Sequence, residues 1–211
     1  MPRLTAQTIF SDAEKERIEA AVRDAESRTS GEIVPLVVDE SYDYPQAEIV
    51  GAGFFSLATA TTLSWAFAGS SLWVFLALFL LLFFPFRCLL RRLPELKRRL
   101  IHPGEIAAEV EEKALVSFIE QGLHHTRDET GILILVSLFE HRVFVLADRG
   151  INNRVPKETW DEIVRIVTEG IRSGRTCEAL CAAIGRCGDL LETHFPKKTD
   201  DTDELPNLIL G

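Results

Sequence analysis

Apolar residues are concentrated in one long block in the first half of the chain. No Lys, Arg, Asp, Glu or His occurs from Ile49 to Phe86, a run of 38 residues. At about 1.5 Å per helical residue this run would extend roughly 57 Å, nearly twice the ~30 Å thickness of the hydrocarbon core of a bilayer. The run is too long for one transmembrane helix and suits two. We therefore predict a transmembrane helical hairpin over residues 49–90.

The two halves of this apolar run differ in character. Residues 49–67 are rich in Gly, Ala, Ser and Thr, whereas residues 72–86 are almost entirely Leu and Phe. Small residues let membrane helices approach closely, so the first half suits close packing against the second. The segment Ala68–Ser71 predicts the turn, and Trp65 and Trp73 flank it, as expected of indole rings at a membrane interface. A re-entrant or surface position of the first half is the alternative to two full spans.

A short basic segment follows the apolar run. It contains six cations, which we call the membrane collar: Arg87, Arg91, Arg92, Lys97, Arg98 and Arg99. Lys and Arg are enriched on the cytoplasmic side of membrane helices, so residues 91–99 are predicted to be a juxtamembrane segment on that side. With two spans, both termini are then cytoplasmic. An alternative role of the collar, binding of anionic lipid headgroups, places it on the same face of the membrane.

The sequence before the hairpin predicts one helix and one strand. Ser11 and Glu14 have the spacing of a capping box, and the apolar positions that follow have helical spacing up to a stop near Gly31. The apolar run Glu32–Val38 predicts a short buried strand, in which Pro35 indicates an edge or a bulge. One helix and one strand cannot bury their apolar faces alone.

The sequence after the collar supplies the remaining elements of such a domain. Pro103 opens a helix with apolar residues at every fourth position, and Gly122 ends it. Residues 131–137 and 143–147 predict two strands joined by a hairpin, and two amphipathic helices follow them.

Joined together, the two parts predict one discontinuous α/β domain of helices on a small mixed sheet. It would comprise residues 8–48 and 100–195, with the hairpin inserted after the first strand. Residues 196–211 are predicted to be a docked C-terminal tail rather than a part of the sheet.

The charge distribution excludes some classes of function. The chain carries 23 Lys and Arg residues against 32 Asp and Glu residues, and positive charge is concentrated in the collar. No long basic surface remains elsewhere, which argues against nucleic acid as a partner. The N-terminal segment is highly charged and contains no small-residue cleavage site, so we do not expect a secretory signal peptide.

Four short motifs occur in an order that is typical of a known family. They are Thr29-x-Gly31-Glu32-Ile-Val, Thr126-x-x-x-x-Gly131-Ile-Leu-Ile-Leu-Val-Ser137, Glu140-x-x-Val143 and Asp148-x-Gly150-Ile151. Together they resemble the TPM domain, over most of residues 8–195 apart from the hairpin. The segments His194-Phe-Pro196 and Glu204-Leu-Pro206-Asn207 resemble a bacterial, membrane-bound branch of that family.

This resemblance implies a three-layer α/β/α fold and a place in the bacterial inner membrane. It also implies a phosphatase-like activity, because some members hydrolyse phosphate esters weakly, and a divalent metal, which some bacterial members bind. The usual members have a signal peptide, an exported domain and a C-terminal anchor. In this chain the predicted anchor lies inside the domain, which points to a domain held at the inner face of the membrane.

Polar residues beside the predicted strands are the candidates for chemistry. Carboxylate and amide oxygens suit Mg²⁺ or Ca²⁺, and the candidate ligands are Asp128, Glu140, Asp148 and Asn152. Ligands usually bind beyond the carboxyl ends of strands, which favours Asp148, and Arg149 beside it could hold a phosphate. The alternative is that Asp148 only caps a turn.

Other chemistry finds little support in the sequence. There is no P-loop, Gly-x-Ser-x-Gly, His-Glu-x-x-His or dinucleotide motif, and no nucleophile has an evident base beside it. Cys177, Cys181 and Cys187 share the apolar face of one predicted helix, and their spacing matches no zinc site, so we predict that they pack in the core.

Two hypotheses of function follow. In the first, a membrane-bound TPM-like domain contacts membrane lipids or other membrane proteins. In the second, the chain is a divalent-metal-dependent phosphatase that acts on a phosphate ester near the membrane. The second hypothesis requires that several of the four candidate ligands converge on one point, whereas the first requires no such site.

Overall fold

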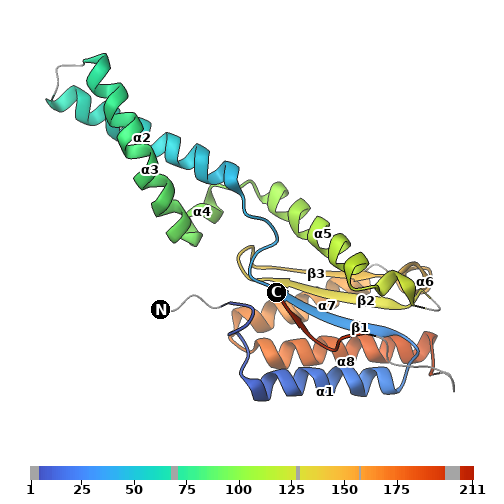
Figure 1. Ribbon diagram of the computed structural model, residues 1–211. Coiled ribbons are helices and arrows are strands. Elements are labelled where there is room, and N and C mark those ends of the chain that lie inside the picture. The colour runs from blue at the N-terminus through green and yellow to red at the C-terminus, as the bar shows by residue number, and fades with distance from the viewer. Residues whose placement is uncertain (1–4, 68–70, 127–128, 157, 198–204) are drawn as a thin grey trace. The chain divides into compact units, whose positions relative to one another are not determined.

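The chain divides into two compact units in the computed structural model. The structure describes residues 5–67, 71–126, 129–156, 158–197 and 205–211. The α/β unit combines residues 1–41 with residues 107–211, and the hairpin unit consists of residues 42–106. Figure 1 labels the elements of both.

The α/β unit contains a mixed sheet of four strands in the order β3-β2-β1-β4. Strand β1 (Glu32–Val38) pairs in parallel with β2 (Gly131–Ser137), and β2 pairs antiparallel with β3 (Arg142–Ala147). All residues of β1 and β2 are buried. Such continuous apolar strands are typical of a sheet that is covered on both faces.

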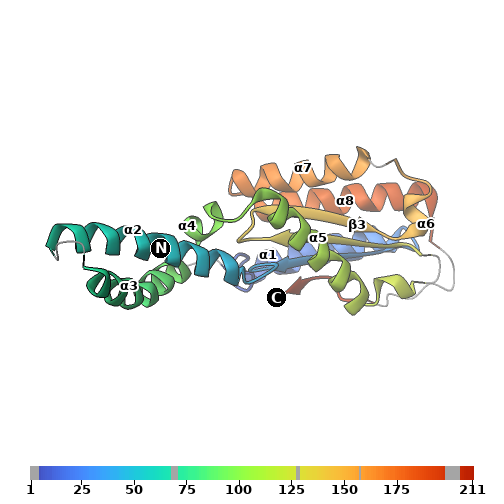
Figure 2. The ribbon, with the colours of Figure 1, turned by 90° about the horizontal axis from the view of Figure 1, so that it is seen from above.

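Helices cover both faces of this sheet. Helices α1 (Asp12–Ser27), α7 (Glu158–Arg172) and α8 (Thr176–His194) pack on one face, and α5 (Pro103–Glu120) packs on the other (Figures 1 and 2). Alternate strand residues enter the two cores, so that Ile33 and Val37 face α1 and α8, whereas Val34 and Leu36 face α5. The predicted three-layer α/β fold is confirmed.

The sequence signals for helix ends correspond to observed structure. Ser11 and Glu14 form the predicted capping box of α1, although this helix ends at Ser27, before the predicted stop near Gly31. Gly122 ends α5 with a φ of 76°, a left-handed conformation that glycine adopts without strain. The 3₁₀ turn η1 (Leu123–His125) then leads toward β2.

The prediction that the C-terminal tail lies outside the sheet was wrong. Residues Ile209–Leu210 form β4, which pairs in parallel with β1 opposite Leu36 and Val37. The Gly211 N–H donates to the Val37 carbonyl (2.9 Å), and Gln7 Nε2 donates to the Leu210 carbonyl (2.7 Å). The tail therefore completes one edge of the sheet.

The hairpin unit contains α2 (Pro45–Phe67), α3 (Leu72–Arg92) and the short α4 (Pro94–Arg99). By length and composition, α2 and α3 could each cross a membrane. The buried face of α2 has small residues at every fourth position, Ala52, Ser56, Ala60 and Ser64. Small side chains at this spacing allow two helix backbones to approach closely. The predicted turn at residues 68–70 lies outside the described residues.

Candidate functional site

The candidate ligands that the structure describes lie at opposite ends of the sheet, Asp148 and Asn152 at one end and Glu140 at the other. Strand β3 runs antiparallel to β1 and β2, so Asp148, which follows β3, lies at the amino ends of the parallel pair. Glu140 follows β2 and lies at the carboxyl ends. Six residues of β3 separate the two ends, roughly 20 Å of extended chain. Asp148 and Glu140 therefore do not converge on one point, and the expectation that Asp148 lies where ligands usually bind in α/β sheets does not hold.

Asp148 has a structural role and one free carboxylate oxygen. Its side chain caps the short helix α6 (Arg149–Asn152) by accepting the Arg149 N–H (2.6 Å), and its own N–H donates to the Gly131 carbonyl (2.9 Å). Within the described residues, its Oδ2 is buried and has no hydrogen-bond partner. The alternative that Asp148 caps a turn is thus observed, and the second oxygen is left available for another ligand.

The other candidates near Asp148 contribute less. The Asn152 amide donates to the Ala147 carbonyl (2.6 Å) and accepts from Trp160 Nε1 (3.1 Å), so both its polar atoms serve the local fold. Arg149 is exposed in the first turn of α6. Asp128 lies outside the described residues.

Glu32 is a second carboxylate at this end of the sheet. It was not among the candidate ligands predicted from the sequence. Glu32 is paired in register with Gly131. Strand alternation puts Glu32, Gly131 and Asp148 on the face that is covered by α5, so the two acids flank a position without a side chain. The Leu123 carbonyl lies only 2.7 Å from where a β-carbon of Gly131 would be. The predicted hairpin, together with this alternation, was the signal that could have placed Asp148 beside Gly131, whereas the neighbouring position of Glu32 follows from the observed pairing of β1 with β2.

Glu140 belongs to a buried polar cluster at the other end of the sheet. Its carboxylate accepts the Ser41 N–H (2.9 Å) and the Ser137 hydroxyl, and the Ser41 hydroxyl lies 3.0 Å from Ser137 Oγ. The cluster joins the segment after β1 to the turn after β2. Across the described ranges, no three His, Cys, Asp or Glu side chains are grouped as a metal site requires.

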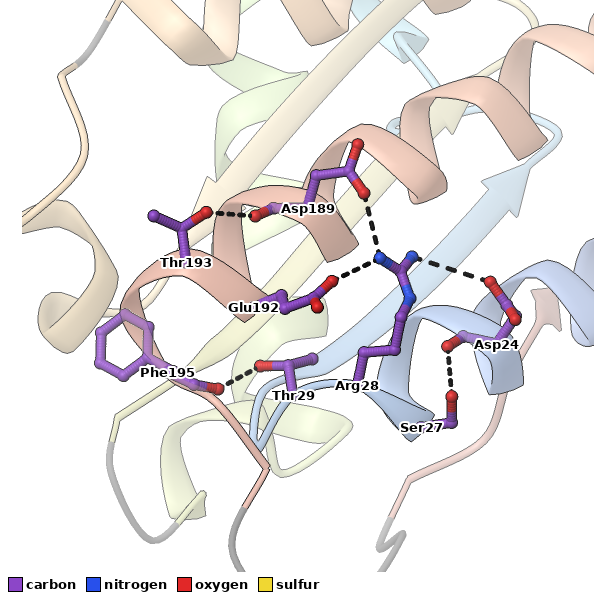
Figure 3. Close-up of polar contacts among 8 residues, drawn as sticks. All are labelled: Asp24, Ser27, Arg28, Thr29, Asp189, Glu192, Thr193 and Phe195. Atoms are coloured by element: carbon purple, nitrogen blue, oxygen red, sulfur yellow. Dashed lines mark hydrogen bonds and ion pairs between the residues drawn. The ribbon is translucent and has the colours of Figure 1, made fainter.

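Residues of the motif around Thr29 connect the segment before β1 to the end of α8 through hydrogen bonds and ion pairs. The Thr29 hydroxyl donates to the Phe195 carbonyl (2.6 Å) and accepts the Gly31 N–H (3.2 Å), as Figure 3 shows for the first of these bonds. Arg28 pairs with Asp189 (3.1 Å) and Glu192 (2.6 Å) on α8. These contacts hold together chain segments that are more than 150 residues apart, so this motif serves assembly rather than chemistry.

The membrane collar is organised around one acidic residue that sequence reasoning assigned to the segment before the hairpin. Glu48 lies in the first turn of α2, and its side chain is only 5% exposed. Its Oε2 lies 2.9 Å from Arg91 Nε and 3.7 Å from Arg87 Nε, and its Oε1 lies 3.2 Å from Lys97 Nζ. The signal that could have found this cluster is an acid at the start of one apolar helix and bases at the end of its neighbour.

The remaining collar residues are at least partly exposed, as the Arg91 side chain also is at 65%. Arg98 pairs with Glu95 one turn away on α4 (2.8 Å), and Arg92 and Arg99 lie at the surface. Arg87, Arg91 and Arg92 belong to the last turns of α3, whereas Lys97, Arg98 and Arg99 belong to α4. The collar is therefore helical throughout, except at Leu93 between the two helices.

Comparison with known proteins supports the family resemblance over part of the chain. The family model of the TPM domain matches residues 100–190, from the segment before α5 into α8. The NMR structure of BA42 protein from the psychrophilic bacterium Bizionia argentinensis is similar in fold, with a TM-score of 0.58 and 23% sequence identity. That likeness covers 95% of this chain and 94% of the other. A search of curated proteins found no match.

Proposed function

We propose that this chain is an integral protein of the bacterial inner membrane whose α2 and α3 cross the bilayer as a hairpin. In this proposal the TPM-like α/β unit and both termini are cytoplasmic. Its function is interaction with other membrane proteins or with the membrane surface. A rigid helical hairpin with a basic end would hold the α/β unit at the inner face, where such partners are found.

The observation that carries this proposal is the exposure of α3. The apolar part of this helix is uncovered within the described residues, with Leu72, Leu80, Leu81 and Phe84 among its exposed side chains. A helix that is apolar on every side is stable only when something apolar surrounds it, and lipid supplies that environment. The adjacent collar then supports the cytoplasmic orientation.

Cysteine labelling in intact cells tests this topology. In a cysteine-free chain, Ser71→Cys between the two helices should react with a membrane-impermeant reagent. Ser27→Cys on α1 and Ser173→Cys after α7 should react only after the membrane is permeabilised. Labelling of Ser27→Cys in intact cells, with Ser173→Cys protected, would show a single crossing and contradict the hairpin.

A second candidate function is a divalent-metal-dependent phosphatase. It is favoured by the buried, unpartnered Oδ2 of Asp148 and by Glu32 across Gly131, which could contribute oxygen ligands to Mg²⁺ or Ca²⁺. Arg149 could then contact a phosphate.

Asp148→Asn separates the two candidate functions, because it removes the charge and keeps the cap. A phosphatase should lose metal affinity and phosphate-ester hydrolysis by at least about tenfold, since a charged ligand is lost. If the chain serves only interaction, the substitution should change stability by about 1 kcal/mol or less. Metal-dependent turnover in the unmodified chain that Asp148→Asn abolishes would favour the phosphatase over the interaction function.

A further inference from the structure

The hairpin unit contains a cluster in which three cations surround one carboxylate. The Glu48 carboxylate forms ion pairs with Arg91 and Arg87 of α3 and with Lys97 of α4, at the distances given above. Lys97 Nζ also donates to the Asp43 carbonyl, which fixes this ammonium group between two acceptors. The carboxylate and Lys97 are buried, whereas the Arg91 side chain is 65% exposed and that of Arg87 is 37% exposed, so both arginines can also reach a group outside the cluster.

The two arginines of this cluster retain unused hydrogen-bond donors. Arg91 gives its Nε to Glu48, which leaves both terminal nitrogens of a guanidinium that has five N–H donors in total. Arg87 Nε is buried 3.7 Å from Glu48 Oε2 without a hydrogen-bond partner in the part of the chain that the structure describes, so the two terminal nitrogens of this partly exposed side chain are the donors that a further anion can reach. Neither arginine has an ion pair other than that with Glu48 among the described residues. One carboxylate therefore leaves the charge of this cluster incompletely balanced.

Because the apolar part of α3 is shorter than the hydrocarbon core, these arginines lie near the boundary between hydrocarbon and headgroups in the proposed membrane. The apolar part from Leu72 to Phe86 spans roughly 22 Å as a helix, which is shorter than the ~30 Å hydrocarbon core. Arg87 follows this part directly, and Arg91 lies one turn further along the same face. Charged side chains at this depth extend toward the headgroups or pair with an anion.

Resting on the proposed transmembrane hairpin, we propose that Arg87 and Arg91 together bind the phosphodiester of one anionic phospholipid. Two guanidinium groups on one helix face can hold phosphate oxygens through paired N–H donors, a geometry that an ammonium group cannot reproduce. Glu48 is the positioning residue, because it orients the Arg91 side chain. An anionic lipid is favoured over a zwitterionic one, because the headgroup cation of the latter would be repelled by the excess positive charge.

Lipid titration of the full-length protein in nonionic detergent micelles, followed by native mass spectrometry, tests this site. The probes are phosphatidylglycerol, phosphatidylcholine and inorganic phosphate. We expect saturable binding of one phosphatidylglycerol, with the two other probes at least tenfold weaker. Inorganic phosphate that binds as tightly as phosphatidylglycerol would show a site for soluble anions, and equal binding of phosphatidylcholine would also overturn the proposal.

Two double variants that lose the same charge distinguish a specific lipid site from general electrostatic attraction of anionic lipid. The double variant Arg87→Gln/Arg91→Gln should weaken phosphatidylglycerol binding at least tenfold. Its matched control, Arg92→Gln/Arg99→Gln, removes two exposed charges that have no contact with Glu48 and should change binding less than threefold. Equal losses in the two variants would show that only net charge matters and would overturn the proposal.

Two further measurements keep the test decisive. Arg87→Lys/Arg91→Lys preserves the charge around Glu48, so it should fold even if the glutamine pair does not, and it should bind the lipid several-fold more weakly. Binding equal to that of the unmodified chain would contradict the arginine assignment.

Extraction of membranes at alkaline pH tests the hairpin separately, because a peripheral protein is released. Failure of lipid binding in a chain that resists extraction refutes this site alone, whereas release refutes the proposed function.

Discussion

At the scale of single residues, the fold suppresses the ionisation of two cysteine thiols. Burial raises the pKa of Cys187 to about 12 and that of Cys177 to about 11, whereas an unfolded chain has a cysteine pKa of about 8.5. Because the folded pKa lies above the unfolded pKa, this contribution to stability is complete below about pH 8.5 and is lost as the pH rises toward 12. We expect the free energy of unfolding of the α/β unit to fall between pH 9 and 11.

Comparison with Cys187→Ala isolates this effect from the titration of other groups. The variant is less stable at pH 7, because it leaves a small cavity, but its stability should decline less steeply between pH 9 and 11. Urea denaturation monitored by circular dichroism at several pH values measures both slopes. Parallel declines in the two proteins would show that the Cys187 thiol does not contribute.

The role of a residue could be predicted from the sequence when its contacts are with residues close to it in the chain. The core placement of Cys177 and Cys187 followed from helical spacing and is confirmed, and the cap at Asp148 was recognised as the alternative to a ligand. The separation of Asp148 from Glu140 could have been predicted from the hairpin, because Glu140 lies in its turn and Asp148 follows its second strand. The position of Asp148 at the amino ends of β1 and β2 could not, since it depends on how β1 pairs with β2. The partners of Glu48 lie 43 and 49 residues away, so no local spacing pattern shows them, and only the predicted antiparallel pairing of the two apolar helices places them near Glu48.

At the scale of elements, two helical glycines differ sharply in their surroundings. A β-carbon on Gly170 in α7 would lie 2.0 Å from Ala179 Cβ in α8, whereas one on Gly185 in α8 would meet no atom within 4 Å. Gly170→Ala should therefore force α7 and α8 apart and cost about 1–3 kcal/mol. Gly185→Ala should gain about 0.5–1 kcal/mol, because alanine loses less entropy in a helix.

Thermal melts of the two alanine variants measure this contrast. About 1 kcal/mol corresponds to a shift of roughly 2–4 °C in the melting temperature of a protein of this size. We expect Gly170→Ala to melt below the unmodified chain and Gly185→Ala to melt slightly above it. Equal melting temperatures would mean that the helices do not touch at Gly170.

Strand β4 is short, yet apolar side chains of its segment enter both cores. Leu208 and Leu210 pack on the side of α1 and α8, and Leu205 and Ile209 pack on the side of α5. Deletion of residues 205–211 should lower the melting temperature and expose the edge of β1, so the shortened chain should self-associate. A synthetic Leu-Pro-Asn-Leu-Ile-Leu-Gly peptide should restore the melting temperature. An unchanged melting temperature after deletion would contradict a structural role of β4.

Long periodic elements were predictable, whereas short elements were not. The apolar spacing from Pro103 to Gly122 predicted α5 because its buried face repeats over several turns. Helix α6 has four residues and β4 has two, too few to show a period. Strand β4 is defined by hydrogen bonds to β1, and no local pattern in the tail contains that information.

At the scale of the whole molecule, the α/β unit needs both parts of the chain. The N-terminal part supplies β1, which lies between β2 and β4, and supplies the fully buried Ile18, Val22 and Ala25 of α1. A fragment of residues 100–211 should therefore lack a cooperative melt and bind hydrophobic dyes.

The matched control keeps every element of the α/β unit. Replacing residues 42–102 by a flexible linker should give a chain that melts cooperatively without detergent, because both cores remain complete. Both chains can be compared by calorimetry. A sharp transition in the 100–211 fragment would show that the N-terminal part is dispensable.

The interruption of the α/β unit also sets the order of events during synthesis. About 90 residues separate the end of β1 from the start of β2, which at a ribosomal rate of roughly 5–20 residues per second is a wait of about 5–20 seconds. During that time α2 and α3 leave the ribosome, while β1 has no partner strand. A nascent chain that carries an unpaired apolar strand is a target for chaperones. The cell must therefore shield β1 until β2 emerges, and the proposed hairpin would reach the insertion machinery before the α/β unit can fold.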